Sequence, residues 1–136
     1  MKFTKHLIYL MLMVFSIGVT AQGLNSQLKP FYYGVASGDP TASAVIIWTH
    51  VTPTMDMDVD VMWQVATDKD MKNIVASGMT TTDSTMDYTV KVDVTGLNAG
   101  TYYYYRFKAM NRYSLVGRTK TAPTGNVTDH LRFAVI

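Results

Sequence analysis

Three aspartates at alternating positions are the residues of this sequence whose type and spacing most suggest metal chemistry. Asp56, Asp58 and Asp60 could present three carboxylates together, and calcium prefers such oxygen ligands. The pattern is not that of an EF-hand loop, because the sixth position is Val61 rather than Gly and the twelfth is Thr67 rather than Glu. We therefore interpret the three aspartates as a solvated loop and strand edge, and assign no metal ligand.

Nucleophilic and histidine chemistry also lacks a supporting pattern. Beyond residue 21 the histidines are His50 and His130, and neither has a neighbouring ligand such as His-x-His. The serines lie in no Gly-x-Ser-x-Gly motif, the sequence has no cysteine, and no glycine-rich loop suited to phosphate occurs. We expect no catalytic, cofactor-binding or metal-binding residue, so this chain by itself is not expected to be an enzyme.

Cations and tyrosines gather in the last third of the sequence. The group consists of Tyr102, Tyr104, Arg106, Lys108, Arg112, Arg118 and Lys120. One interpretation is a solvated sheet face. The other is a docking face for a partner domain, since tyrosine and arginine are enriched in interfaces. A glycosylation sequon at residues 126–128 matters only in a eukaryotic secretory setting, which the sequence does not establish.

The charge balance argues against nucleic acid as a partner. The net charge of +2 comes from Lys2 and Lys5, and the remaining Lys and Arg balance the 10 Asp, with no Glu. The charges are segregated, because eight Asp precede residue 90 and seven Lys or Arg lie from Lys91 onward. Nucleic-acid binding depends on clustered cations that neutralise phosphate, and a neutral domain is a poor candidate.

The N-terminal segment has the pattern of a Sec-type signal peptide. Lys2 and Lys5 precede an apolar run over residues 7–19, and small residues lead to a cleavage site near Ala21/Gln22. The run is shorter than the ~20 residues of a spanning helix, so an uncleaved anchor is the lesser alternative. We expect a secreted or periplasmic protein without stable membrane anchoring after cleavage. Without cysteine, lipidation at that site and disulfides are excluded.

The segment after the turn at residues 96–101 predicts a strand with one buried side. Strand side chains alternate between faces, so residues 103, 105, 107 and 109 share an apolar face and residues 102, 104, 106 and 108 a polar one. A Leu, a Gly-bearing turn and a Tyr at the start of a strand also fit the tyrosine corner of β-sandwiches. We assign that corner to Tyr103.

Alternation and turn residues recur along the sequence, and no convincing 3.6-residue period appears beyond residue 21. The expected strands span residues 31–37, 44–50, 59–65, 74–79, 88–94, 102–109 and 113–119. This pattern predicts an all-β fold, a fibronectin type III or immunoglobulin-like antiparallel sandwich of about seven strands. We expect Trp48 to anchor the core, because an indole removes a large apolar area from water.

The sequence divides into four predicted parts. Residues 1–21 are the signal peptide, 22–30 a flexible tail, 31–123 the sandwich, and 124–136 a linker with a further strand. Residues 131–136 form a mostly apolar run, typical of a strand buried on both faces in an α/β layer. We expect that strand to open a separate catalytic domain that is absent here.

Several motifs in this order resemble the N-terminal domain of the alkaline phosphatase D family. They are Gly34-Val-Ala-Ser-Gly-Asp-Pro40, Ala44-Val-Ile-Ile-Trp-Thr49, Val90-Lys-Val-Asp-Val-Thr-Gly-Leu97, Tyr102-Tyr-Tyr-Tyr-Arg-Phe107, Ser114-Leu-Val-Gly-Arg-Thr-Lys-Thr-Ala-Pro123 and Leu131-Arg-Phe-Ala-Val135. His50 and Ala99 stand where family members usually carry Arg and Pro. The resemblance implies a secreted, metal-dependent phosphatase or phosphodiesterase.

By the same resemblance, this chain is an accessory fragment whose partner is its own catalytic domain. The iron and calcium ligands of the family lie in that domain, so no cofactor is expected in this segment. Two alternatives remain open from the sequence. One is the N-terminal domain of a purple acid phosphatase-like enzyme, and the other is a free-standing secreted adhesion or binding sandwich.

Overall fold

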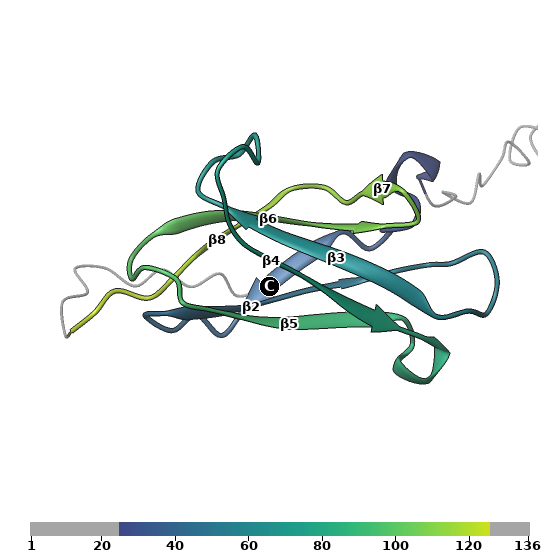
Figure 1. Ribbon diagram of the computed structural model, residues 1–136, viewed down its shortest axis with the longest axis horizontal. Coiled ribbons are helices and arrows are strands. Elements are labelled where there is room, and N and C mark those ends of the chain that lie inside the picture. The colour runs from purple at the N-terminus through teal and green to yellow at the C-terminus, as the bar shows by residue number, and fades with distance from the viewer. Residues whose placement is uncertain (1–24, 126–136) are drawn as a thin grey trace, which may run out of the picture.

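The computed structural model describes residues 25–125, which form two antiparallel sheets packed face to face (Figure 1). The predicted signal peptide, the sequon and the strand at residues 131–136 lie outside the described residues. One sheet has the order β1 (Val35–Gly38), β2 (Ala44–His50), β5 (Thr89–Thr95). The other has the order β4 (Ile74–Thr82), β3 (Val59–Ala66), β6 (Tyr102–Ala109), and then β7 (Arg112–Tyr113) and β8 (Gly117–Lys120), both paired with β6. The predicted all-β sandwich is confirmed.

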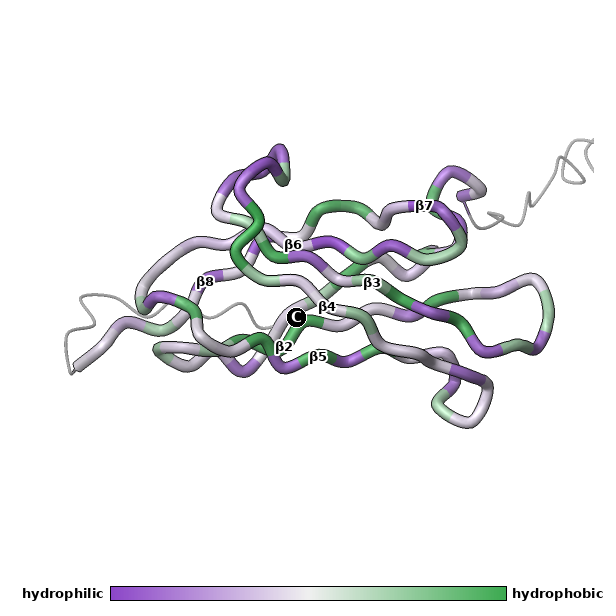
Figure 2. Tube along the Cα trace, viewed as in Figure 1, coloured by the Kyte–Doolittle hydropathy of each residue, from purple (hydrophilic) through white to green (hydrophobic). Residues whose placement is uncertain are grey.

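Alternation along β6 gives the strand one buried and one polar side, as the sequence predicts. Tyr103, Tyr105, Phe107 and Ala109 are all buried, and hydrophilic residues recur between them in Figure 2. The Tyr103 phenol oxygen accepts a hydrogen bond from the Asn98 backbone N–H at 2.8 Å. The tyrosine corner assigned to Tyr103 is therefore confirmed.

The predicted role of Trp48 is wrong, because the opposite side of β2 faces the core. Val45, Ile47 and Thr49 are buried, and in register they oppose the side of β5 that carries Val94, Val92 and Val90. Trp48 points outward and is 44% exposed. Alternation separates the two faces of a strand, but the second sheet decides which one is covered.

The indole that packs against the core is Trp63 of β3. It shares the inward row with Val59, Val61 and Val65, as predicted. Gly78 of β4 lies opposite in register, and a Cβ there would meet Trp63 Cζ2 at 2.6 Å. The glycine thus leaves room for the indole beside the buried valines.

The strand boundaries differ most from the predicted ones at three places. Residues before Val35 form turns and a 3-10 helix, η1 (Ser26–Leu28), and Pro30, placed in the flexible tail, is fully buried. β4 extends to Thr82 and is followed by a second 3-10 helix, η2 (Ser84–Met86). The single strand predicted at residues 113–119 is two short strands, because the Phe107 N–H donates to Ser114 Oγ instead of a backbone carbonyl.

Gly117 of β8 gives a testable case of close packing. A Cβ at this position would meet the ring atom Cζ of the buried Tyr105 at 2.4 Å. We expect Gly117→Ala to lower the free energy of unfolding by about 1–3 kcal/mol, the usual cost of overpacking a core, as measured by urea titration.

The matched control is Gly38→Ala in β1, where no atom lies within 4 Å of the added carbon. Its free energy of unfolding should stay unchanged or rise by up to about 1 kcal/mol, because alanine restricts the unfolded chain. Equal stability of the two variants would contradict this account of Gly117.

Candidate functional site

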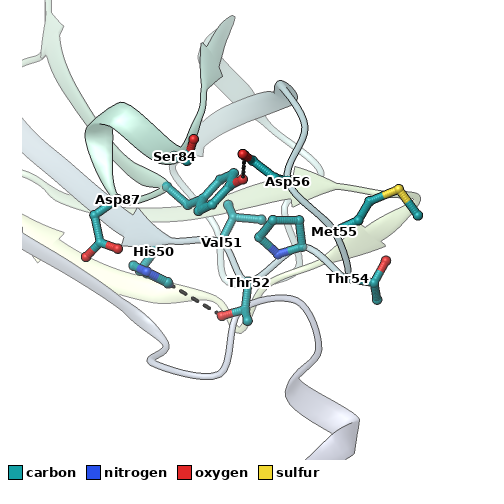
Figure 3. A pocket seen from close by; sticks show the side chains of 10 residues that line it. His50, Val51, Thr52, Thr54, Met55, Asp56, Ser84 and Asp87 are labelled. Atoms are coloured by element: carbon teal, nitrogen blue, oxygen red, sulfur yellow. Dashed lines mark hydrogen bonds between the residues drawn. The ribbon is translucent and has the colours of Figure 1, made fainter.

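A depression of about 390 Å³ lies at the end of the sandwich where β2 ends and β5 begins. Its wall joins the loop after β2 to η2 and the residues just before β5 (Figure 3). The Tyr88 phenol donates a hydrogen bond to Asp56 Oδ1 at 2.6 Å and accepts one from the Met57 backbone N–H at 3.3 Å. One tyrosine therefore fixes the long loop between β2 and β3.

This contact shifts the pKa values of both partners. The hydrogen bond from Tyr88, with a smaller one from Ser84, lowers the pKa of Asp56. The same hydrogen bond raises the pKa of Tyr88, because it favours the protonated phenol beside the carboxylate. Asp56 is exposed and Tyr88 is half-buried against the core, so the pair acts as a latch that ties the loop to the sandwich.

The three alternating aspartates do not form a metal site in the structure. Asp56 faces Tyr88, whereas Asp60 accepts a hydrogen bond from Thr81 Oγ1 of β4 at 2.8 Å. Among residues 25–125, no three His, Cys, Asp or Glu side chains lie close enough to hold a metal ion. Two of the three carboxylates, those of Asp56 and Asp60, thus serve local hydrogen bonds.

Two side chains, those of Thr52 and Tyr33, lie against the His50 ring. Its Nδ1 lies 3.5 Å from Thr52 Oγ1, and its ring meets the edge of Tyr33 with the centroids 4.9 Å apart. His130 lies outside the described residues. These contacts hold the His50 ring between Tyr33 and Thr52.

The predicted group of cations and tyrosines lies on the outer side of β6, β7 and β8. We call this set of residues the basic tyrosine face: Tyr102, Tyr104, Arg106, Lys108, Tyr113, Arg118 and Lys120. Arg112 is exposed but pairs with the inward-facing Ala109, so it is not part of this face. Tyr113, which the sequence reasoning missed, joins the face because it pairs with Lys108 across β6 and β7.

Cationic side chains lie over the Tyr113 ring at one end of the face and over the Tyr102 ring at the other. The Arg106 guanidinium carbon lies 4.0 Å from the centroid of the Tyr113 ring, and Lys108 Nζ lies 5.2 Å from it. At the other end, Arg118 and Lys120 approach the Tyr102 ring to 5.2 and 5.0 Å. These distances lie within the range of cation–π attraction. The rings therefore hold the cationic side chains against the sheet.

A hollow of about 250 Å³ opens on this face between the β3–β4 loop and β8. It is lined by Lys69, Tyr104, Val116 and Arg118. Lys69 lies in the loop at residues 67–73. Nothing in the sequence indicates that it lines the same hollow as Arg118. Within residues 25–125 the ion pair found is Lys72 with Asp70 at 3.3 Å, so no carboxylate of the described residues pairs with the cations of the face.

The comparison with known proteins decides the family. The profile of the N-terminal domain of PhoD-like phosphatases matches residues 18–123. The chain belongs to this family. The family found is the one that the sequence motifs resemble, and the match is to its N-terminal domain.

One relative and one solved structure agree with this assignment. Alkaline phosphatase D of Bacillus subtilis (strain 168) is 39% identical over 106 residues, which cover 73% of this chain and 18% of that protein. The solved structure of PhoD matches with a TM-score of 0.70 and 36% identity, over 76% of this chain and 21% of that chain. A fibronectin type III domain of human collagen alpha-1(XX) matches with a TM-score of 0.44 and 15% identity, over 86% of this chain and 100% of that domain.

The chain therefore spans less than a fifth of the length of its curated PhoD-like relative. Within residues 25–125, no helix has the length and apolar character needed to cross a membrane.

The latch between Tyr88 and Asp56 predicts a specific pH dependence. Because the folded pKa of Asp56 is lowered, its stabilising contribution is present above the ordinary Asp pKa of about 3.9 and is lost as the pH falls through the folded value. We expect Tyr88→Phe to lower the urea midpoint near pH 6, and this difference from the wild type to shrink as Asp56 becomes protonated.

The control is Tyr33→Phe, which removes a phenol from a ring that is 68% exposed and lies against His50. Its urea midpoint should follow that of the wild type across the whole pH series. A Tyr88→Phe effect of the same size at every pH would show that the hydrogen bond from the Met57 N–H, and not the one to the carboxylate, holds the loop, because phenylalanine keeps the ring.

Proposed function

We propose that this chain is the accessory N-terminal domain of a secreted PhoD-like phosphoesterase, with a structural and docking role and no catalysis of its own. The family match to an N-terminal domain is the observation that carries this proposal. The parent enzyme hydrolyses phosphate mono- or diesters in a catalytic domain of the same polypeptide, which is the partner of this sandwich.

The way in which the chain leaves the sandwich supports a docking role. The Ala122 N–H donates to the Thr41 carbonyl at 2.9 Å, and the Ala122 carbonyl accepts from the Gly100 N–H at 3.0 Å. Thr121 is buried, and its hydroxyl donates to the Asn98 carbonyl at 2.6 Å and accepts from the Thr101 N–H at 3.0 Å. These contacts hold the outgoing segment against two loops, so a domain attached after it would start from a fixed direction.

The family resemblance implies iron and calcium in the parent enzyme, and residues 25–125 do not fit either ion. Asp56 and Asp60 are held by Tyr88 and Thr81, and no triad of ligating side chains is present among these residues. Any such metals belong to the catalytic domain. Export through the predicted Sec signal, cleaved near Ala21/Gln22, completes the proposal.

The reading frame after Ile136 and an activity assay test the proposal together. We expect the frame to continue into a metal-binding domain. The complete gene product should release nitrophenol from bis(p-nitrophenyl) phosphate or p-nitrophenyl phosphate when iron and calcium are supplied, and the 136-residue chain alone should release none.

Two results would contradict the proposal. A stop codon directly after Ile136 would favour the free-standing adhesion or binding sandwich. Ester cleavage by the 136-residue chain, with divalent ions added, would show that the sandwich itself is catalytic.

A further inference from the structure

The basic tyrosine face arranges its charges in a line. The outward residues of β6 fall in four successive rows, and a cation stands in each row: Lys120 opposite Tyr102, Arg118 opposite Tyr104, then Arg106, then Lys108 opposite Tyr113. Outward residues of a strand recur every two positions, or about 6.7 Å, so the line of charge is about 20 Å long.

These cations are held in place but remain available to a ligand. The two ring contacts at each end orient the charged groups, and Arg106 Nε donates to Gln64 Oε1 of β3 at 2.9 Å. On the outer side of β3 and β4, the described strands carry one carboxylate, Asp60, which is engaged by Thr81. The guanidinium and ammonium charges therefore lack a compensating anion within the sheet.

The hollow beside the second row adds a place where an anionic group could sit. Lys69 approaches it from the β3–β4 loop and Arg118 from β8, and Tyr104 lies between them. Two cations and a phenol supply only donors toward such a group, and arginine presents a planar fork that matches phosphate oxygens.

We propose that the basic tyrosine face is a binding site for a linear polymer that carries one phosphodiester group per repeat, because the fold gathers four cations on this face although the net charge beyond residue 21 is zero. The line of cations matches a polyanion that lies along β6, and the hollow takes one phosphate. The choice of phosphate over another anion rests on the proposed function, in which the parent enzyme acts on phosphate esters.

A polymer fits this face better than the buried domain interface considered from the sequence. The core of a protein interface is depleted in charged residues, and burial of four cations would cost several kcal/mol for each ion without matched carboxylates. A polymer strand on the surface leaves the cations partly hydrated and gains from the release of counterions.

The test uses the 136-residue chain and synthetic poly(propane-1,3-diyl phosphate), a phosphodiester polymer without sugars or bases. We expect binding by calorimetry that weakens about fiftyfold between about 50 and 200 mM salt, since four contacts give a slope of about −2.8 in log K against log salt. Poly-L-glutamate of equal charge should bind more weakly, because it lacks phosphate.

Two variants of equal net charge locate the site. Arg118→Gln with Lys120→Gln should weaken binding at low salt by at least about tenfold and halve the salt slope, because two of four contacts are lost. Lys91→Glu removes the same two units of net charge away from the face, since Lys91 lies on the outer side of β5 in the other sheet. This control should bind like the wild type.

Three results would overturn the proposal. Equal losses in both variants would mean that net charge alone attracts the polymer. Equal affinity for poly-L-glutamate would remove the preference for phosphate. No binding by the wild-type chain would leave the face to domain docking. None of these readouts depends on hydrolysis or on sequence after Ile136, so they stay separate from the test of the proposed function.

Discussion

The alternation of side chains along β6 is the constraint on which both the core and the candidate surface depend. The inward positions supply Tyr103, Tyr105 and Phe107 to the core, and the outward ones supply four of the seven residues of the basic tyrosine face. A slip of one residue would exchange the two sets and bury the cations. The Tyr103 phenol opposes such a slip, because its bond to Asn98 fixes the start of the strand to the turn before it.

The sequence alone was sufficient to predict those elements that a local residue pattern specifies. The period of two along β6 and the Leu-turn-Tyr order locate the strand and its tyrosine corner without any knowledge of the second sheet. Trp48 shows the limit of that reasoning, because its hydrophobicity does not specify which side of β2 is covered. The side with Val45 and Ile47 is buried because it opposes the valines of β5 in register.

The residue types of the basic tyrosine face could be predicted from the sequence, but the contacts between its side chains could not. The cations could be counted in the sequence, yet their contacts depend on pairing between strands. Tyr113 reaches Arg106 only because β7 folds back on β6, and Lys69 reaches the hollow from a loop more than thirty residues before β6. Arg112 was grouped with the others by proximity in sequence, and pairing with Ala109 separates it from the face.

The position of this face relative to the outgoing chain connects the two proposals. Lys120 is the last cation of the line and is followed directly by Thr121 and Ala122, which are bonded to the loops at the same end of the sandwich. A polymer bound along β6 would therefore have one end near the point where the chain leaves for its catalytic domain. Because that point is held by backbone hydrogen bonds, the direction of the polymer would be fixed relative to the outgoing segment. An accessory domain built in this way could raise the local concentration of a polymeric substrate without any catalytic residue of its own.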